Sequence, residues 1–198
     1  MKYIFVTGAP GSKWSSVVRN IYYSSDIDRS DSSPKRTYRD ELHLGAYWDP
    51  GMEFGQFFHR LSEYDHYQCE TEFDAPFTGK GVKIIKSHYF AQHIDYIKNT
   101  WPDSPIVLAH RTDDACLGWW VKCGGFDIAY PDYAHYKSFD NLALKIQQQN
   151  AGIVAAALRY PGHTPLNNHQ LCEILKISPP PLEYHQNYGQ SDVRVTVI

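Results

Sequence analysis

A short apolar run followed at once by a glycine-rich turn constrains the fold of this chain more than any other stretch. Residues 3–7 read Tyr-Ile-Phe-Val-Thr, the β-rich pattern of a buried strand, and the turn after them contains Gly8 and Gly11. The next residues are apolar at helical spacing, which predicts a helix over residues 15–23. A strand, a tight glycine turn and a helix start present backbone N–H groups to an anion.

The turn also carries side chains that suit a phosphate. Gly11 permits a close approach of the backbone to an anion, Ser12 and Ser15 offer hydroxyl groups, and Lys13 offers a positive charge. The spacing departs from the Walker loop G-x-x-x-x-G-K-[ST], because Gly8 to Lys13 is one residue too short. Two interpretations therefore stand side by side: a phosphate-binding loop, or an ordinary strand-to-helix turn with serine caps and a solvated lysine.

Strands and helices alternate along the rest of the chain. Apolar, β-rich strands are predicted over residues 82–86 and 105–109, and a helix is expected after each. This pattern favours an α/β fold of three layers, with a mainly parallel sheet and helices on both of its faces. The other expectations are strands at 43–47 and 193–197, irregular chain at 65–81, and helices at 54–64, 90–101, 138–160 and 164–176.

Composition limits the possible partners. The 198 residues suit one domain, with a polar, mobile loop expected over residues 24–42. A net charge of −3 argues against a broad nucleic-acid surface, and the longest apolar run, residues 153–158, is too short for a membrane span. The four cysteines have no C-x-x-C spacing. We expect a cytoplasmic protein without nucleic-acid or membrane partners, and the sequence leaves its oligomeric state open.

Polar residues follow three of the predicted strands. They are the loop from Gly8 to Ser15, the segment Lys86-Ser87-His88, and His110-Arg111. In a parallel sheet, the carboxyl ends of the strands meet at one edge, where ligands bind. These segments resemble those of the sulfotransferase family, which uses 3′-phosphoadenosine 5′-phosphosulfate (PAPS) on a P-loop-type α/β fold. Gly11-Ser12-Lys13-Trp14 resembles its Gly-Thr-Thr-Trp loop, Lys86-Ser87-His88-Tyr89 resembles Lys-Thr-His-Leu, and the strand ending near Arg111 resembles its 3′-phosphate element.

The resemblance implies a role for each matching residue. His88 would be the general base, an assignment that imidazole suits because it titrates near neutrality. Lys86 would help to neutralise the transferring group, and Lys13 could share that role from the loop. Gly11, Ser12, Lys13 and Ser15 would hold the 5′-phosphate, Trp14 would stack on adenine, and Arg111 would clamp the 3′-phosphate.

The implied activity is transfer of a sulfuryl group from PAPS to a hydroxyl or amine of a small-molecule or glycan acceptor, leaving 3′-phosphoadenosine 5′-phosphate (PAP), without a metal ion. Two positions depart from the family pattern: Ala9 stands where the loop has a basic residue, and Trp119 where a serine follows the arginine. These departures favour an alternative, a catalytically degenerate nucleotide-binding member of the fold. A P-loop nucleotide kinase or NTPase is the other alternative.

Overall fold

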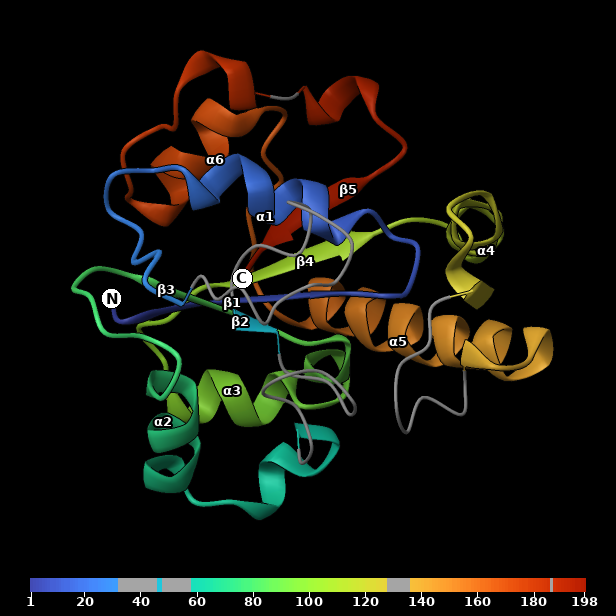
Figure 1. The fold of residues 1–198 in the computed structure, drawn as a ribbon, viewed down its shortest axis with the longest axis horizontal. Helices are drawn as coiled ribbons and strands as arrows, with labels where there is room; N and C mark the ends of the chain where they lie inside the picture. The colour runs from blue at the N-terminus through green and yellow to red at the C-terminus, as the bar shows by residue number, and fades with distance from the viewer. Residues whose placement is uncertain (32–45, 48–57, 128–135, 186) are drawn as a thin grey trace.

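The computed structural model describes residues 1–31, 46–47, 58–127, 136–185 and 187–198. Its centre is a five-stranded sheet in the order β2-β3-β1-β4-β5 (Figure 1). The first four strands are parallel, and β5 runs antiparallel to β4. The strands are β1 (Tyr3–Gly8), β2 (Ala46–Tyr47), β3 (Lys83–Lys86), β4 (Ile106–His110) and β5 (Arg194–Val197). The predicted α/β class with a mainly parallel sheet is confirmed.

Helices lie on both faces of the sheet. Figure 1 shows α1 and α6 on one side, and α2, α3 and α5 on the other. The helices are α1 (Trp14–Tyr22), α2 (His66–Asp74), α3 (Ile94–Thr100), α4 (Asp113–Lys122), α5 (Phe139–Arg159) and α6 (Asn168–Leu175). Short 3-10 helices include η1 (Phe58–Glu63), η2 (His88–Gln92) and η6 (Tyr188–Gln190). Residues 43–45 of the strand predicted at 43–47, and residues 54–57 of the helix predicted at 54–64, lie outside the described residues.

Alternation along the strands divides the core in two. In β1, Ile4 and Val6 point to the cluster that includes α1 and α6, while Tyr3 and Phe5 point to the cluster that includes α2 and α3. The same alternation holds in β4. All six residues of β1 are buried, which explains its continuous apolar sequence, since both faces of a central parallel strand are covered.

The prediction of irregular chain at residues 65–81 is wrong, because α2 occupies half of that stretch. Asp65 caps the helix by accepting a hydrogen bond from Gln68 N (2.8 Å), and the Gln68 side chain accepts one from Asp65 N (3.2 Å). This reciprocal capping box satisfies two backbone donors at the helix start. The helix has a weak apolar stripe, with only Cys69 and Phe73 buried, so periodicity could not reveal it.

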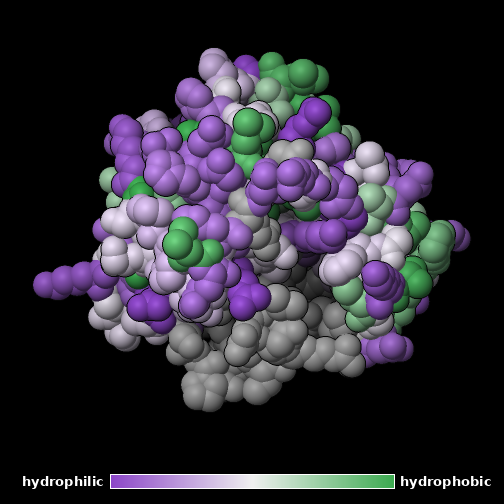
Figure 2. All heavy atoms as spheres, turned by 90° about the horizontal axis from the view of Figure 1, so that it is seen from above, coloured by the Kyte–Doolittle hydropathy of each residue, from purple (hydrophilic) through white to green (hydrophobic). Residues whose placement is uncertain are grey.

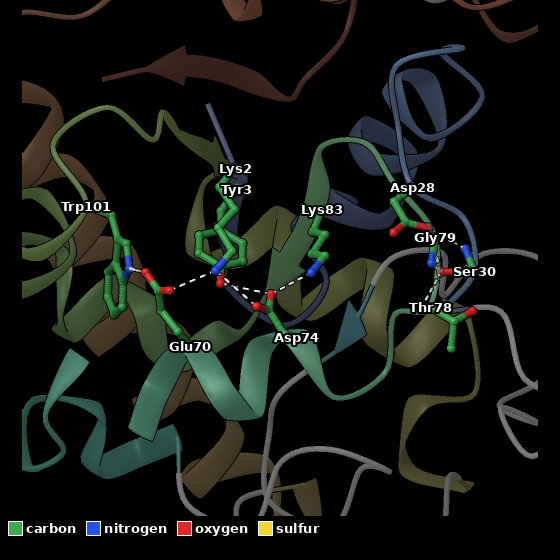
Figure 3. A network of polar contacts seen from close by, with 10 residues as sticks. All are labelled: Lys2, Tyr3, Asp28, Ser30, Glu70, Asp74, Thr78, Gly79, Lys83 and Trp101. Atoms are coloured by element: carbon green, nitrogen blue, oxygen red, sulfur yellow. Dashed lines mark hydrogen bonds and ion pairs between the residues drawn. The ribbon is translucent and has the colours of Figure 1, made fainter. Parts of the chain in front are cut away.

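Charged side chains join α2 to the amino-terminal parts of β1 and β3 (Figure 3). Asp74 accepts hydrogen bonds from Lys83 (2.6 Å) and Tyr3 (2.9 Å) and pairs with Lys2 (3.0 Å). Glu70 binds Lys2 (2.7 Å) and the indole N–H of Trp101 (2.9 Å). Partial burial alone would raise the pKa of Asp74, but the hydrogen bonds from Lys83, Lys2 and Tyr3 outweigh this effect and hold the pKa below 3.8.

Two predicted helices are shorter than their sequence patterns indicated. The helix expected over residues 90–101 is divided into η2 and α3, because His93 leaves helical geometry at φ −121°. The helix expected from Thr164 begins only at Asn168, where Asn167 caps it by accepting from Gln170 N (3.0 Å). An asparagine cap with a satisfied hydrogen bond defines this start better than the Thr-Pro pair does.

The chain reverses its direction of progress through the sheet at β1. From β1 it passes to β2 and β3 on one side, and then to β4 on the other. In open α/β sheets, ligands bind outside the carboxyl ends of the two strands at such a reversal, here β1 and β4. The loop after β1 and the residues after β4 lie at this edge, so the topology points to the same edge as the sequence did.

The surface over α1 and α6 is mostly hydrophilic, and its apolar residues form separate groups (Figure 2). Within the described ranges, none of the helices combines the length and apolar character that a membrane crossing requires.

Candidate functional site

The loop between β1 and α1 is the first part of the site. Gly11 has φ 77°, in the left-handed region, and a Cβ atom there would lie 2.0 Å from the carbonyl oxygen of Cys116 in α4. Only glycine fits this position, because a side chain would be strained by its backbone angle and would also collide with backbone. The loop therefore packs closely on α4, which follows β4.

Ser12 and Lys13 complete the turn into α1. Ser12 N donates to Ala9 O (2.9 Å), and the fully buried Ser12 Oγ has no hydrogen-bond partner among the described residues. Lys13 is the N-cap residue of α1 and is also left-handed, at φ 61°. Ser15, half-buried, is the second residue of the helix. Left-handed residues at a helix start turn successive N–H groups toward one side, as an anion-binding nest does.

His88 and Trp14 form the second part of the site. Their rings are stacked, with centroids 4.2 Å apart, and the Lys86 ammonium lies 5.8 Å from the indole centroid. His88 follows β3 as the first residue of η2, and its Nδ1 is bonded to the carbonyl oxygen of Gly8. A carbonyl only accepts, so Nδ1 carries the proton and Nε2 keeps the lone pair. The loop after β1 thus fixes the tautomer that a general base at Nε2 requires.

Burial keeps His88 neutral. It is 4% exposed, and desolvation lowers its pKa to about 3; Lys145 and Lys86 lower it further, while the bond to Gly8 opposes the shift. Lys145, in α5, lies 3.8 Å from the ring centroid of Tyr89, the residue after His88. An anion placed beside these two lysines would raise the pKa of His88 toward the neutral range.

Arg111 is the third part of the site, just past β4. Its Nη1 donates to Gly11 O (2.8 Å), so the guanidinium supports the loop after β1. Its Nη2 binds Asp192 Oδ2, and Lys13 Nζ lies 3.3 Å from Asp192 Oδ1. Asp113, at the start of α4, accepts from Asn150 Nδ2 (2.6 Å), which also donates to Arg111 O (2.8 Å).

Hydrogen bonds and a ring contact therefore join all three predicted segments. Gly8 binds His88, Gly11 binds Arg111, and Trp14 packs on His88. Thr112 occupies the N-cap position of α4, but its side chain makes no capping hydrogen bond. Asn150 from α5 holds the adjoining residues in its place.

Sequence reasoning missed Asp192 and Lys145, and it named Tyr89 without giving it a role. Asp192 reaches the site through the antiparallel register of β5, in which Arg194 pairs with His110. Asp192 precedes the first residue of β5 by two positions and binds Arg111. A local sequence pattern cannot predict an ion pair between residues 179 positions apart, such as Lys13 and Asp192. The sequence gives only a weak indication of a site role for Lys145, which precedes the buried residue Ile146 on α5, the helix that packs against η2.

No group of three His, Cys, Asp or Glu side chains suited to a metal ion occurs within the described part of the chain. Comparisons with protein-family models, with curated proteins and with solved structures found no match.

Proposed function

We propose that this chain is a sulfotransferase-like enzyme with a P-loop-type three-layer α/β fold. It would transfer a sulfuryl group from PAPS to a hydroxyl or amine of a small-molecule or glycan acceptor. The observation that carries the proposal is the convergence of the three strand ends. His88 after β3 and Arg111 after β4 each contact the loop after β1 directly, at the carboxyl edge of the sheet.

The chain's own residues would divide the work as follows. The N–H groups at the start of α1 and the Ser12 hydroxyl would bind the 5′-phosphate. Lys86 and Lys13 would neutralise the negative charge that develops on the transferring group, which is the main contribution a protein makes to such a transfer. The Ser12 hydroxyl fits a role in phosphate binding because its oxygen is buried and unpaired in the described structure. Leaving a buried hydroxyl without a hydrogen-bond partner costs free energy, which a bound phosphate would recover.

His88 would accept the acceptor's proton at Nε2 as the new oxygen–sulfur or nitrogen–sulfur bond forms and the bond to the leaving phosphate breaks. Its low pKa in the absence of an anion makes it a weak base. The negative charge of the bound phosphosulfate beside Lys86 would offset the two lysines and strengthen the base when it is needed. The bond from Nδ1 to Gly8 would hold the ring in place throughout.

A second function, nucleotide binding without catalysis, is favoured by the position of Trp14. Its ring is buried against His88, whereas the resemblance assigns it to adenine. If this packing persists when nucleotide is bound, His88 cannot approach an acceptor. The two functions differ in whether any turnover exists.

The test is transfer of labelled sulfate from PAPS to a panel of phenols, amines and glycans, together with PAP binding by calorimetry. His88→Asn should reduce turnover about 100-fold or more, while the dissociation constant for PAP stays within about threefold. PAP binding without turnover on any acceptor would favour the non-catalytic reading. Binding of ATP with magnesium in the same calorimetry, without binding of PAP, would favour a kinase or NTPase and contradict the proposal.

A further inference from the structure

The Asp192 carboxylate lies between two cations, Arg111 and Lys13, to which the family resemblance would give phosphate-binding roles. The Arg111 side chain is 6% exposed, while the Asp192 side chain that pairs with it is 50% exposed. Asp192 uses both oxygens, Oδ2 for Arg111 and Oδ1 for Lys13. A planar carboxylate has no third oxygen to offer.

Arg111 has one further donor that this carboxylate does not satisfy. Its Nε is buried and has no hydrogen-bond partner among the described residues. Nε and Nη2 lie on the same edge of the planar guanidinium, the edge that binds oxyanions through two parallel hydrogen bonds. Asp192 engages Nη2 alone. A tetrahedral oxyanion could engage Nε, Nη2 and Lys13 Nζ with three different oxygens.

We infer that Asp192 occupies the place of a ligand phosphate, and that a phosphate monoester binds Arg111 and Lys13 by displacing it. This inference deepens the proposed function and rests on it for the choice of site. The segment can release the carboxylate without unfolding, because it is anchored on both sides of Asp192. Tyr188 is buried and accepts a hydrogen bond from Asn20 (3.0 Å), and β5 begins at Arg194.

The displacement makes the site selective. A tethered carboxylate competes at an effective concentration on the order of millimolar, so a ligand with the same two oxygens and single charge, such as acetate, gains nothing over Asp192. A dianionic phosphate monoester brings an additional charge and an additional oxygen. The hydrogen bonds from Arg111 and Lys13 hold the pKa of Asp192 below 3.8, so the carboxylate remains charged at neutral pH and only a stronger anion relieves the contact.

The test compares Asp192→Asn with the wild-type chain, using inorganic phosphate, PAP and acetate as probes in calorimetry at fixed ionic strength. Asp103→Asn is the matched control, because it removes the same charge from an exposed residue just before β4, at the opposite edge of the sheet. Asp192→Asn should bind phosphate and PAP about fivefold to tenfold more tightly than wild type. The control should stay within about twofold, and wild type should not bind acetate.

Equal or weaker phosphate binding by Asp192→Asn would overturn the inference. If PAP bound the wild type and Asp192→Asn equally, the inference would fail while the proposed function stood. If Asp192→Asn gained affinity for phosphate but PAP bound no better than phosphate in any variant, the inference would stand and the proposed function would fail. An absence of anion binding in every variant would overturn both.

A second readout needs no variant. In the wild-type chain, the carboxyl carbon of Asp192 should shift in its nuclear magnetic resonance as phosphate saturates the site, because the carboxylate exchanges two cations for water. The carboxyl carbon of Asp103 should not shift. An unchanged Asp192 resonance at saturating phosphate would contradict displacement.

Discussion

Replacing Gly11 by alanine tests the geometry of the loop most severely. The residue has φ 77°, and an added Cβ would lie 2.0 Å from the carbonyl oxygen of Cys116. The left-handed angle alone costs alanine about 1–2 kcal/mol. Ordinary van der Waals contact begins well beyond 3 Å, so the loop or α4 must move by roughly 1 Å, and overpacking of this kind costs about 1–3 kcal/mol. We expect Gly11→Ala to lower the free energy of unfolding by about 2–5 kcal/mol in total.

Gly118 supplies the matched control. It lies within α4, and an added Cβ would meet nothing within 4 Å. The same substitution there should stabilise the chain by about 0.5–1 kcal/mol, because alanine is the better helix former. Urea unfolding followed by tryptophan fluorescence measures both. For a chain of this size, Gly11→Ala should lower the melting temperature by roughly 5–15 °C. A Gly11→Ala variant within about 0.5 kcal/mol of wild type would refute the loop geometry.

Three further substitutions test other parts of the structure. His88 has a folded pKa of about 3, below its unfolded value of 6.5, so the unfolded chain binds more protons between these values and stability is lost as pH falls through that window. The slope of unfolding free energy against pH from 4 to 6 should therefore be smaller in His88→Asn than in wild type. An equal slope in the two chains would exclude a buried neutral imidazole. Gln149 is fully buried, and neither of its amide atoms has a hydrogen-bond partner among the described residues. Gln149→Met should therefore be neutral or stabilise by up to about 1 kcal/mol in urea unfolding. A destabilisation of more than about 1 kcal/mol would contradict an unsatisfied amide and indicate a buried water at this site. The bonds from Lys83, Lys2 and Tyr3 lower the pKa of Asp74, and this contributes stability above pH 3.8 that is lost as pH falls below it. Asp74→Asn should be less stable than wild type at pH 7, with a smaller difference at pH 3. A stability difference that does not depend on pH would contradict the network.

The central strands were predictable because β1 and β4 are largely apolar on both faces. β1, β3 and β4 were each placed within about one residue of their bounds, because each is a short β-rich run bounded by polar or turn residues. The position of α5 was also foreseen, with Ser138 as its cap accepting from Asn141 N (3.2 Å). Strong local patterns determined these elements.

The errors arose where stability comes from specific polar contacts. Helix α2 depends on its capping box and on Asp74 and Glu70, none of which changes the apolar periodicity. The break at His93 has no proline or glycine to announce it. A prediction that searches for reciprocal Asp-x-x-Gln pairs would have found α2, but the contacts with Lys2 and Lys83 depend on the tertiary fold.

The candidate site divides in the same way. The topology rule placed Lys13, His88 and Arg111 at one edge, and their contacts through Gly8, Gly11 and Trp14 agree with that placement. The stacking of Trp14 on His88 and the pairing of Arg111 with Asp192 could not be foreseen, because both depend on side-chain packing across distant segments. Asp192 in particular follows from the register of an antiparallel edge strand.

The dissociation constant of PAP for the wild-type chain and for Arg111→Gln tests the central claim most directly. The glutamine keeps a polar group in the buried position but removes the charge and the paired donors of the guanidinium. Loss of charged hydrogen bonds to a phosphate should weaken binding about 10-fold to 100-fold, without any dependence on magnesium. Saturable PAP binding that Arg111→Gln weakens in this range would support a nucleotide phosphate site at the carboxyl edge of the sheet. Equal affinity in the two chains, or no saturable binding at millimolar PAP, would contradict it.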